Sequence, residues 1–186
     1  CSRGVLLENG TISMTGSPTD IVSTYMAGSG SCENKRVFSE GRHERDFILH
    51  SIEVVSTDDK SGGNVLDENS WLQINTEITV NEHVKQLHLS FVLYGENGEP
   101  LFSFSHAREN LFLMPGFSRV KCEFPKGFLN VGTFFLALYV IKDLRTTVFV
   151  EQNILSFRIH EGQRELGRWM GKEPGFIKPK FKWQVL

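Results

Sequence analysis

The chain has 186 residues, and 20 Lys and Arg residues against 22 Asp and Glu residues give it a net charge of −2. This near-neutral balance excludes a general electrostatic attraction for nucleic acid or an anionic membrane, so we expect no nucleic-acid partner. No apolar stretch approaches the ~20 residues that cross a bilayer. The three cysteines are odd in number and widely spaced, which excludes a disulfide framework and is typical of a reducing compartment.

The first thirty residues predict a hairpin followed by a helix. Gly4–Glu8 and Thr11–Met14 are short strand candidates, and Asn9-Gly10 between them is a strong turn because both positions tolerate positive φ. Ser17-Pro18 begins a helix as N-cap and first helical residue, and the helix should end near Met26. The chain has neither an initiator Met nor a signal peptide, so we expect a fragment of a longer protein.

Residues 31–45 are polar and charged without clear periodicity, and we interpret them as an extended linker. They would join the hairpin–helix unit, residues 1–30, to a domain formed by residues 46–186.

From residue 46 onward, apolar and polar residues alternate with the two-residue period of β-strands. The clearest case is Trp71–Val80, in which Leu72, Ile74 and Ile78 share the predicted core face. Seven or eight short strands are predicted in this way: Phe47–Val55, Trp71–Val80, Leu87–Tyr94, Leu101–His106, Val120–Phe124, Val131–Ile141, Val148–Val150 and Leu155–Ile159. The fold class is therefore all-β, an immunoglobulin-like antiparallel β-sandwich preceded by a short β-hairpin plus helix.

The last 26 residues contain glycines and prolines that break regular elements, yet they are rich in aromatic residues. Trp169, Phe176, Phe181 and Trp183 make this segment too apolar for a disordered tail. We expect it to dock on its own sandwich or on a neighbouring chain.

The sequence gives no basis for catalysis, a metal site or a cofactor. It contains no G-x-S-x-G, H-E-x-x-H or paired-cysteine motif. His83 and His88 are five residues apart, and an odd separation on a strand sends two side chains to opposite faces. We therefore expect a binding domain and no enzyme.

Sugars are recognised by flat aromatic rings together with polar side chains that hydrogen-bond hydroxyl groups. One face of the sandwich could supply both kinds of group. The candidate glycan-binding residues are Trp71, Gln73, His88, Tyr94, His106, Arg108, Asn110, Tyr139 and Arg158. Two plain alternatives stay open: exposed aromatic residues often pack beneath a loop or tail, and surface arginines often form ion pairs.

Several segments, in this order, resemble a known family. Cys1–Gly10 and Gly16–Tyr25 resemble the end of an ABC-transporter nucleotide-binding domain, where C-D-R-x-x-x-L-x-x-G-x-I-x-x-x-G-x-P-x-x-V-x-x-Y follows the switch histidine. Ser2 stands where that pattern has Asp. Further matches are Gly98–Phe102, Gly116–Pro125, Leu129–Phe134, which resembles L-x-x-G-x-Y with Phe in place of Tyr, and the tail Gly175–Trp183.

Together these segments resemble the C-terminal part of Wzt-type ATP-binding subunits of polysaccharide ABC exporters. The resemblance implies a cytoplasmic module at the inner face of the inner membrane of a Gram-negative bacterium. It implies binding of lipid-linked O antigen by its modified non-reducing end, which couples chain completion to export. The implied partners are the transmembrane permease subunit and a second copy of the chain, swapped through residues 169–186.

The resemblance also implies that the ATPase motifs lie upstream of Cys1, so this stretch itself should not hydrolyse ATP. The alternative function is structural: a dimerisation or docking module that holds two ATPase subunits together and has no sugar site.

Overall fold

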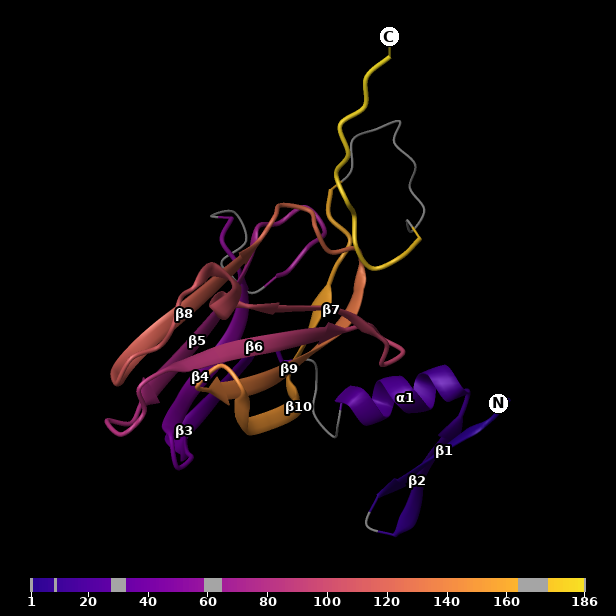
Figure 1. Ribbon diagram of the computed structural model, residues 1–186. Coiled ribbons are helices and arrows are strands. Elements are labelled where there is room, and N and C mark those ends of the chain that lie inside the picture. Colours follow the sequence, from indigo (N-terminus) through magenta and orange to yellow (C-terminus); the bar gives the residue numbers. More distant parts are fainter. Residues whose placement is uncertain (1, 9, 28–32, 59–64, 164–173, 186) are drawn as a thin grey trace.

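The computed structural model describes residues 2–8, 10–27, 33–58, 65–163 and 174–185. At the N-terminal end, β1 (Gly4–Glu8) and β2 (Thr11–Gly16) form an antiparallel hairpin, and α1 (Pro18–Ala27) follows it (Figure 1). The Ser17 hydroxyl accepts the N–H of Asp20 at 3.2 Å and donates to its carboxylate at 2.7 Å, as a capping residue does. The predicted hairpin and helix start are confirmed.

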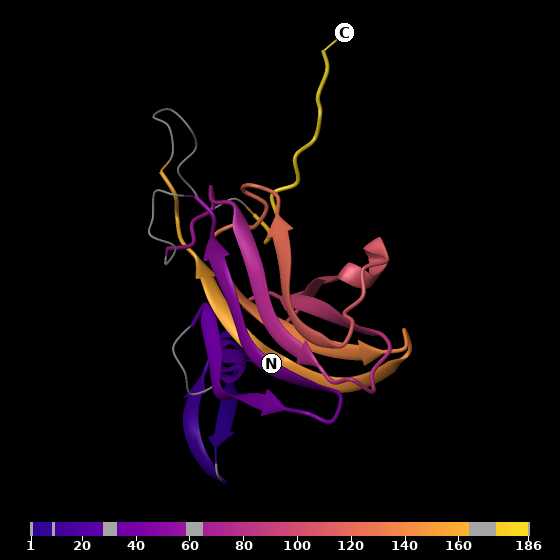
Figure 2. The same cartoon turned by 90° about the vertical axis from the view of Figure 1, so that its left-hand side faces the viewer.

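Two four-stranded antiparallel sheets form the body of the described chain (Figures 1 and 2). Their strand orders are β10-β9-β6-β7 and β3-β4-β5-β8. The bounds are β3 (Lys35–His43), β4 (Phe47–Ser56), β5 (Leu72–Val80), β6 (Leu87–Tyr94), β7 (Pro100–Ser105), β8 (Gly116–Phe124), β9 (Gly132–Lys142) and β10 (Thr146–Ile159), with a 3₁₀ turn, η1 (His106–Glu109), after β7. The predicted all-β sandwich is confirmed.

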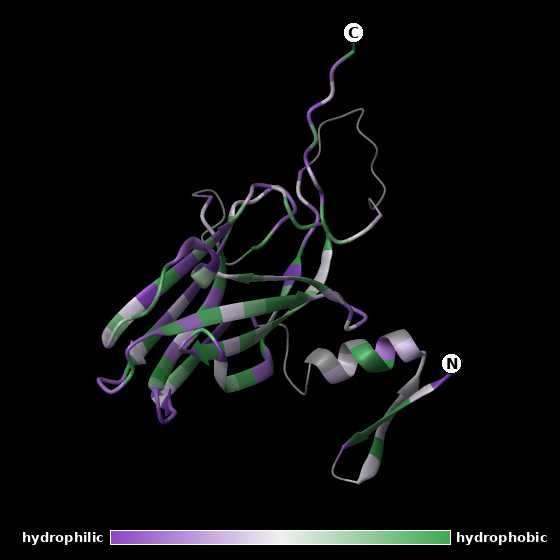
Figure 3. Ribbon diagram, viewed as in Figure 1, coloured by the Kyte–Doolittle hydropathy of each residue, from purple (hydrophilic) through white to green (hydrophobic). Residues whose placement is uncertain are grey.

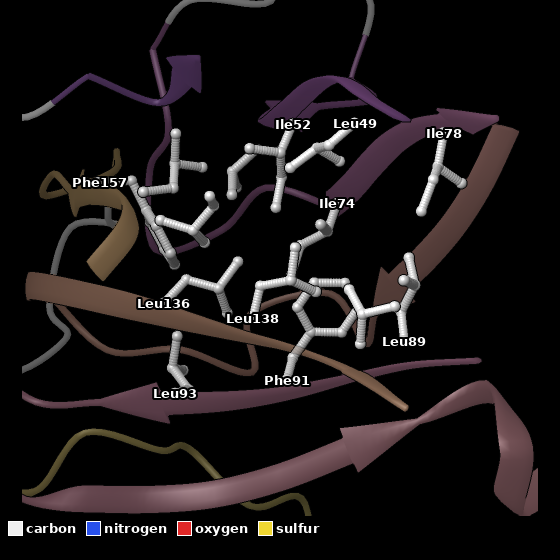
Figure 4. Close-up of a cluster of buried hydrophobic side chains, with 14 of the residues drawn as sticks. Leu49, Ile52, Ile74, Ile78, Leu89, Phe91, Leu93, Leu136, Leu138 and Phe157 are labelled. Carbon is white, nitrogen blue, oxygen red and sulfur yellow. The ribbon is translucent and has the colours of Figure 1, made fainter. Parts of the chain in front are cut away.

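The core lies between the two sheets and is built from alternate residues of their strands (Figure 4). The two-residue alternation of hydrophobic and hydrophilic residues is visible along the strands in Figure 3. Ile74 and Ile78 of β5 face Leu89, Phe91 and other buried residues of the opposite sheet, as their spacing predicts. Burial of such side chains contributes about 1.5–3 kcal/mol each, so this alternation largely determines which face of each strand turns inward.

The interpretation of residues 31–45 as a linker is wrong, because Lys35–His43 forms β3 and pairs with β4. This is an edge strand, so much of its surface is exposed and polar, and only Phe38 packs against the core. Its register against β4 shifts between Val37 and Arg42, which interrupts the alternation that would otherwise reveal a strand. Residues 28–32 lie outside the described residues.

The last strand is longer than the sequence predicts. The segments Val148–Val150 and Leu155–Ile159 belong to one strand, β10, which spans Thr146–Ile159. Its pairing with β9 shifts between Glu151 and Leu155, and the neighbouring residues Ile154 and Leu155 are both buried, so the two-residue alternation is interrupted halfway along the strand.

The tail docks on its own sandwich over part of its length. Phe176 packs against the core, and Ile177 bridges to Leu129. The Lys178 ammonium pairs with the buried carboxylate of Glu68. Trp169 lies outside the described residues. Beyond Lys180 the chain leaves the sandwich (Figure 1): the exposed side chains there are Phe181, Trp183 and Val185. Within the described residues, no helix is both long and apolar enough to cross a membrane.

Candidate functional site

The nine predicted residues do not share one face. Trp71 and Gln73 belong to the outer side of the β3-β4-β5-β8 sheet. The other seven lie on or beside the opposite sheet: His88, Tyr94, His106, Arg108, Asn110, Tyr139 and Arg158. The alternation within each strand was predicted correctly, but assignment of strands to sheets depends on long-range pairing, which alternation does not specify.

Two of these seven residues are histidines, of which His88 is buried and His106 is half-buried. The His106 ring accepts the N–H of Leu89 at Nε2, at 2.9 Å, and donates from Nδ1 to the carbonyl of Leu111 at 2.7 Å. Both of its nitrogens are thus used by the backbone. His88 is buried beside it, with ring centroids 6.3 Å apart. Burial lowers the pKa of both imidazoles, and for His88 the proximity of His106 lowers the pKa further.

Most of the remaining predicted residues near that sheet contact neighbouring residues of the fold. Asn110 caps η1 in the left-handed conformation, with φ of 57°. Arg108 donates to the Ser103 hydroxyl at 3.3 Å, and Arg158 is exposed on β10. Tyr94 and Tyr139 interact with each other, and burial followed by the hydrogen bond with Tyr139 raises the pKa of Tyr94.

The outer side of the β3-β4-β5-β8 sheet gathers polar side chains into one surface, which we call the polar face. Strand pairing places Asn75 of β5 opposite Glu53 of β4 and Lys121 of β8, and Glu77 opposite Ser51 and Arg119. Because these residues occupy every second position, they all lie on the side away from the core. The polar face consists of Lys35, Ser51, Glu53, Gln73, Asn75, Glu77, Arg119 and Lys121.

Hydrogen bonds connect one half of the polar face around Glu53. Its carboxylate pairs with the Lys35 ammonium at 2.9 Å and accepts the Asn75 amide N–H at 3.0 Å. Gln73, itself nearly buried, donates to the amide oxygen of Asn75. Burial would raise the pKa of Glu53, but the hydrogen bonds from Lys35 and Asn75 outweigh it and lower that pKa. Glu53 is therefore an ionised acceptor at neutral pH.

The other half is organised around Glu77. Its Oε1 accepts from Nε and Nη2 of Arg119 at 2.9 and 2.6 Å, and its Oε2 accepts from the Ser51 hydroxyl at 3.1 Å. These bonds from Arg119 and Ser51 lower the pKa of Glu77. The side chains are thus fixed in place before any ligand arrives.

A hollow of about 210 Å³ opens between the two halves. It is lined by carboxylates, an amide, a hydroxyl and cationic groups, with both donors and acceptors close together. Glu53 and Glu77 balance the charges of Lys35 and Arg119, and Lys121 leaves a single positive charge in excess. Such a lining suits a neutral molecule with many hydroxyl groups better than a strongly charged one.

Exposed aromatic rings stand near the two ends of β5. Trp71 immediately precedes the strand and is 45% exposed, and Phe117 lies opposite Thr79 near the other end and is 61% exposed. The polar face therefore combines hydrogen-bonding groups with flat apolar surfaces, the two features that sugars require.

A second hollow of about 320 Å³ lies at the opposite edge of the sandwich from β3 and β10. Its apolar lining comes from Phe91, Phe104, Leu111, Val120 and Cys122, between the edge strands β7 and β8. The predicted residues His106 and Arg108 border it. Burial raises the pKa of the Cys122 thiol, which therefore stays protonated. Within the described residues, no cluster of three or more His, Cys, Asp or Glu side chains could hold a metal ion.

Most of the polar face lies outside the set of residues predicted from the sequence. Ser51 and Glu53 alternate on β4, and Arg119 and Lys121 alternate on β8, with the same two-residue period that singled out Trp71, just before β5, and Gln73. The alternation of polar residues was therefore visible in the sequence of each strand. The missing information was that β4 and β8 flank β5 in one sheet.

Comparison with known proteins finds similarity in the fold. No family model and no curated protein sequence matches the chain. Among solved structures, the crystal structure of the C-terminal domain of Wzt is similar, with a TM-score of 0.58 over 78% of this chain and 86% of that chain. The two sequences are 11% identical. The sandwich that the family resemblance implied is therefore the one that the chain adopts.

Proposed function

We propose that this domain binds the polysaccharide carried by an ABC exporter and that it catalyses no reaction. The observation that carries the proposal is the polar face, a pre-arranged network of donors and acceptors with an exposed aromatic ring near each end. The similarity to the C-terminal domain of Wzt supports the same setting, a subunit of an O-antigen exporter with a permease partner.

In this proposal the domain works in the cytoplasm, at the inner face of the inner membrane of a Gram-negative bacterium. It recognises lipid-linked O antigen, with the modified non-reducing end of the completed chain as the preferred form. Binding then couples completion of the chain to its export. The network around Glu53 and Glu77 supports recognition because its groups need no reordering when sugar hydroxyls replace water.

The test is calorimetric titration of the domain with the O polysaccharide of its own source bacterium, with and without the terminal modification. Saturable binding is expected, tighter for the modified chain. Asn75→Ala removes a group from the centre of the polar face and should weaken binding about tenfold. Asn97→Ala, in the exposed turn between β6 and β7, is the matched control and should bind normally. Normal binding by Asn75→Ala would exclude the polar face.

A second candidate function is dimerisation, and the end of the tail favours it. Phe181, Trp183 and Val185 alternate with Lys180, Lys182 and Gln184, which is the pattern of a strand with one apolar face. The apolar residues are 70%, 88% and 103% exposed. The tail points away from its own sandwich (Figure 1), so a second copy of the chain is the proposed partner. The mass of the protein in solution tests this candidate.

A further inference from the structure

The ring of Trp71 is carried by a fixed piece of backbone. Its N–H donates to the carboxylate of Asp58 at 3.2 Å, and its carbonyl accepts the N–H of Thr57 at 2.9 Å. An indole exposed in this way presents a flat apolar surface that a sugar ring can stack on. Here the backbone on both sides of the ring is held, so the ring forms a pre-positioned apolar surface near one end of the polar face.

Phe117 provides the corresponding surface near the other end. It lies opposite Thr79 in the strand register, and its ring centroid is 6.0 Å from that of His50. The His50 ring is in turn joined to the Thr79 hydroxyl at 2.8 Å. The Phe117 ring is therefore packed against His50 on one side, while most of its surface stays exposed.

The polar groups of β5 lie in a row between these two rings. Gln73, Asn75 and Glu77 follow Trp71 at two-residue intervals on the outer side of the sheet. At about 3.3 Å per residue, the eight steps from Trp71 to Thr79 span about 26 Å. That span accommodates several sugar rings in a chain, and one ring alone cannot reach both aromatic residues.

We infer that the polar face binds a run of consecutive sugar rings along β5, with one aromatic contact at Trp71 and another at Phe117. The inference rests on the proposed function and specifies its ligand as an extended segment of a largely neutral glycan. It concerns how many rings the face contacts, and it holds whether or not a terminal modification adds to the affinity.

Fragments of the source bacterium's own polysaccharide test this inference. Partial acid hydrolysis and size separation give monosaccharides, disaccharides and longer oligosaccharides, and the affinity of each is measured by calorimetry. Affinity should rise with length until a fragment spans both rings and then level off. Trp71→Ala and Phe117→Ala should each weaken binding of the longest fragments about tenfold. Because a disaccharide cannot reach both rings, at most one of these variants should weaken disaccharide binding.

Tyr25→Ala is the matched control, because Tyr25 is an exposed aromatic residue on α1, away from the polar face. It should bind the longest fragments with the affinity of the unmodified chain. Disaccharides that bind as tightly as the longest fragments would overturn the inference while leaving the proposed function intact. Loss of long-fragment binding in only one of the two aromatic variants would have the same meaning. Failure of every fragment to bind the folded domain would overturn the proposed function itself.

Discussion

At the scale of single residues, His106 shows how a side chain chosen for a ligand can instead hold the fold. Its ring connects Leu89 of β6 to Leu111 after η1, accepting at one nitrogen and donating at the other. Only the neutral ring with its proton on Nδ1 can make both bonds. A histidine with both nitrogens bonded to the backbone has no free group for a sugar hydroxyl, so we assign His106 a structural role.

This arrangement predicts a loss of stability in mild acid. The pKa of His106 is lowered by burial from its ordinary 6.5, as is that of His88 beside it. Folding therefore favours the neutral rings: their contribution is complete above about pH 6.5 and is lost as the pH falls through the lowered pKa values. Loss of the Leu89 bond should cost about 1 kcal/mol. The carboxylates of Glu53 and Glu77, whose pKa values are also lowered from 4.5, titrate below this window.

Urea unfolding between about pH 7.5 and pH 5 measures the effect. His106→Gln should reduce the dependence of the unfolding midpoint on pH, because the glutamine does not titrate. His160→Gln, at an exposed position just after β10, serves as the control and should keep the dependence of the unmodified chain. An identical slope in His106→Gln would show that His106 does not carry the acid sensitivity.

At the scale of elements, β3 is held to the opposite sheet by an ionic cluster. Glu151 of β10 pairs with Arg36 at 2.6 Å and also with Arg42, and both arginines belong to β3. Their guanidinium carbons lie 4.9 and 4.6 Å from the ring centroids of Phe38 and Phe149. The cluster thus joins the edge strands of the two sheets, and its arginines cover apolar rings at the same time.

Glu151→Gln should loosen this edge. Removing the carboxylate leaves two arginines close together without their shared partner, and we expect a loss of about 1 kcal/mol in the free energy of unfolding, a modest figure because the cluster is partly exposed. The loss should shrink at high salt, and amide exchange should accelerate in β3 before other strands. Glu123→Gln, exposed on β8, should change stability by less than about 0.5 kcal/mol. Equal exchange rates in β3 of both variants would contradict this role.

The same elements explain what the sequence could predict. Regular strands such as β5 and β6 bury every second residue, so alternation alone located them and their core faces. The edge strand β3 was not predicted because its charged residues are stabilised by Glu151, which lies more than a hundred residues away in sequence. The polar face was not predicted for a similar reason: Glu53, Asn75 and Lys121 become neighbours only through strand pairing. Local spacing predicts elements, and the site depends on which elements are neighbours.

At the scale of the whole molecule, the sandwich is closed along one edge and open along the other. Ion pairs join β3 to β10, whereas the apolar hollow between β7 and β8 stays accessible. The tail offers a complementary surface in Phe181, Trp183 and Val185, and full burial of each would contribute roughly 1.5–3 kcal/mol. A second copy of the chain could thus bury apolar surface that one copy leaves exposed.

Removal of residues 181–186 should therefore convert a dimer into a monomer, measured as mass by light scattering. The truncation keeps the contacts that fix the earlier part of the tail, namely the Lys178–Glu68 pair and the bond from Lys180 to the carbonyl of Lys126. The sandwich should consequently retain its urea midpoint. Phe181→Ser combined with Trp183→Ser tests the same surface at full length and should also give a monomer. A truncated chain that remains dimeric would place the interface elsewhere. A truncated monomer that still binds polysaccharide would show that the polar face recognises glycan within a single copy of the chain.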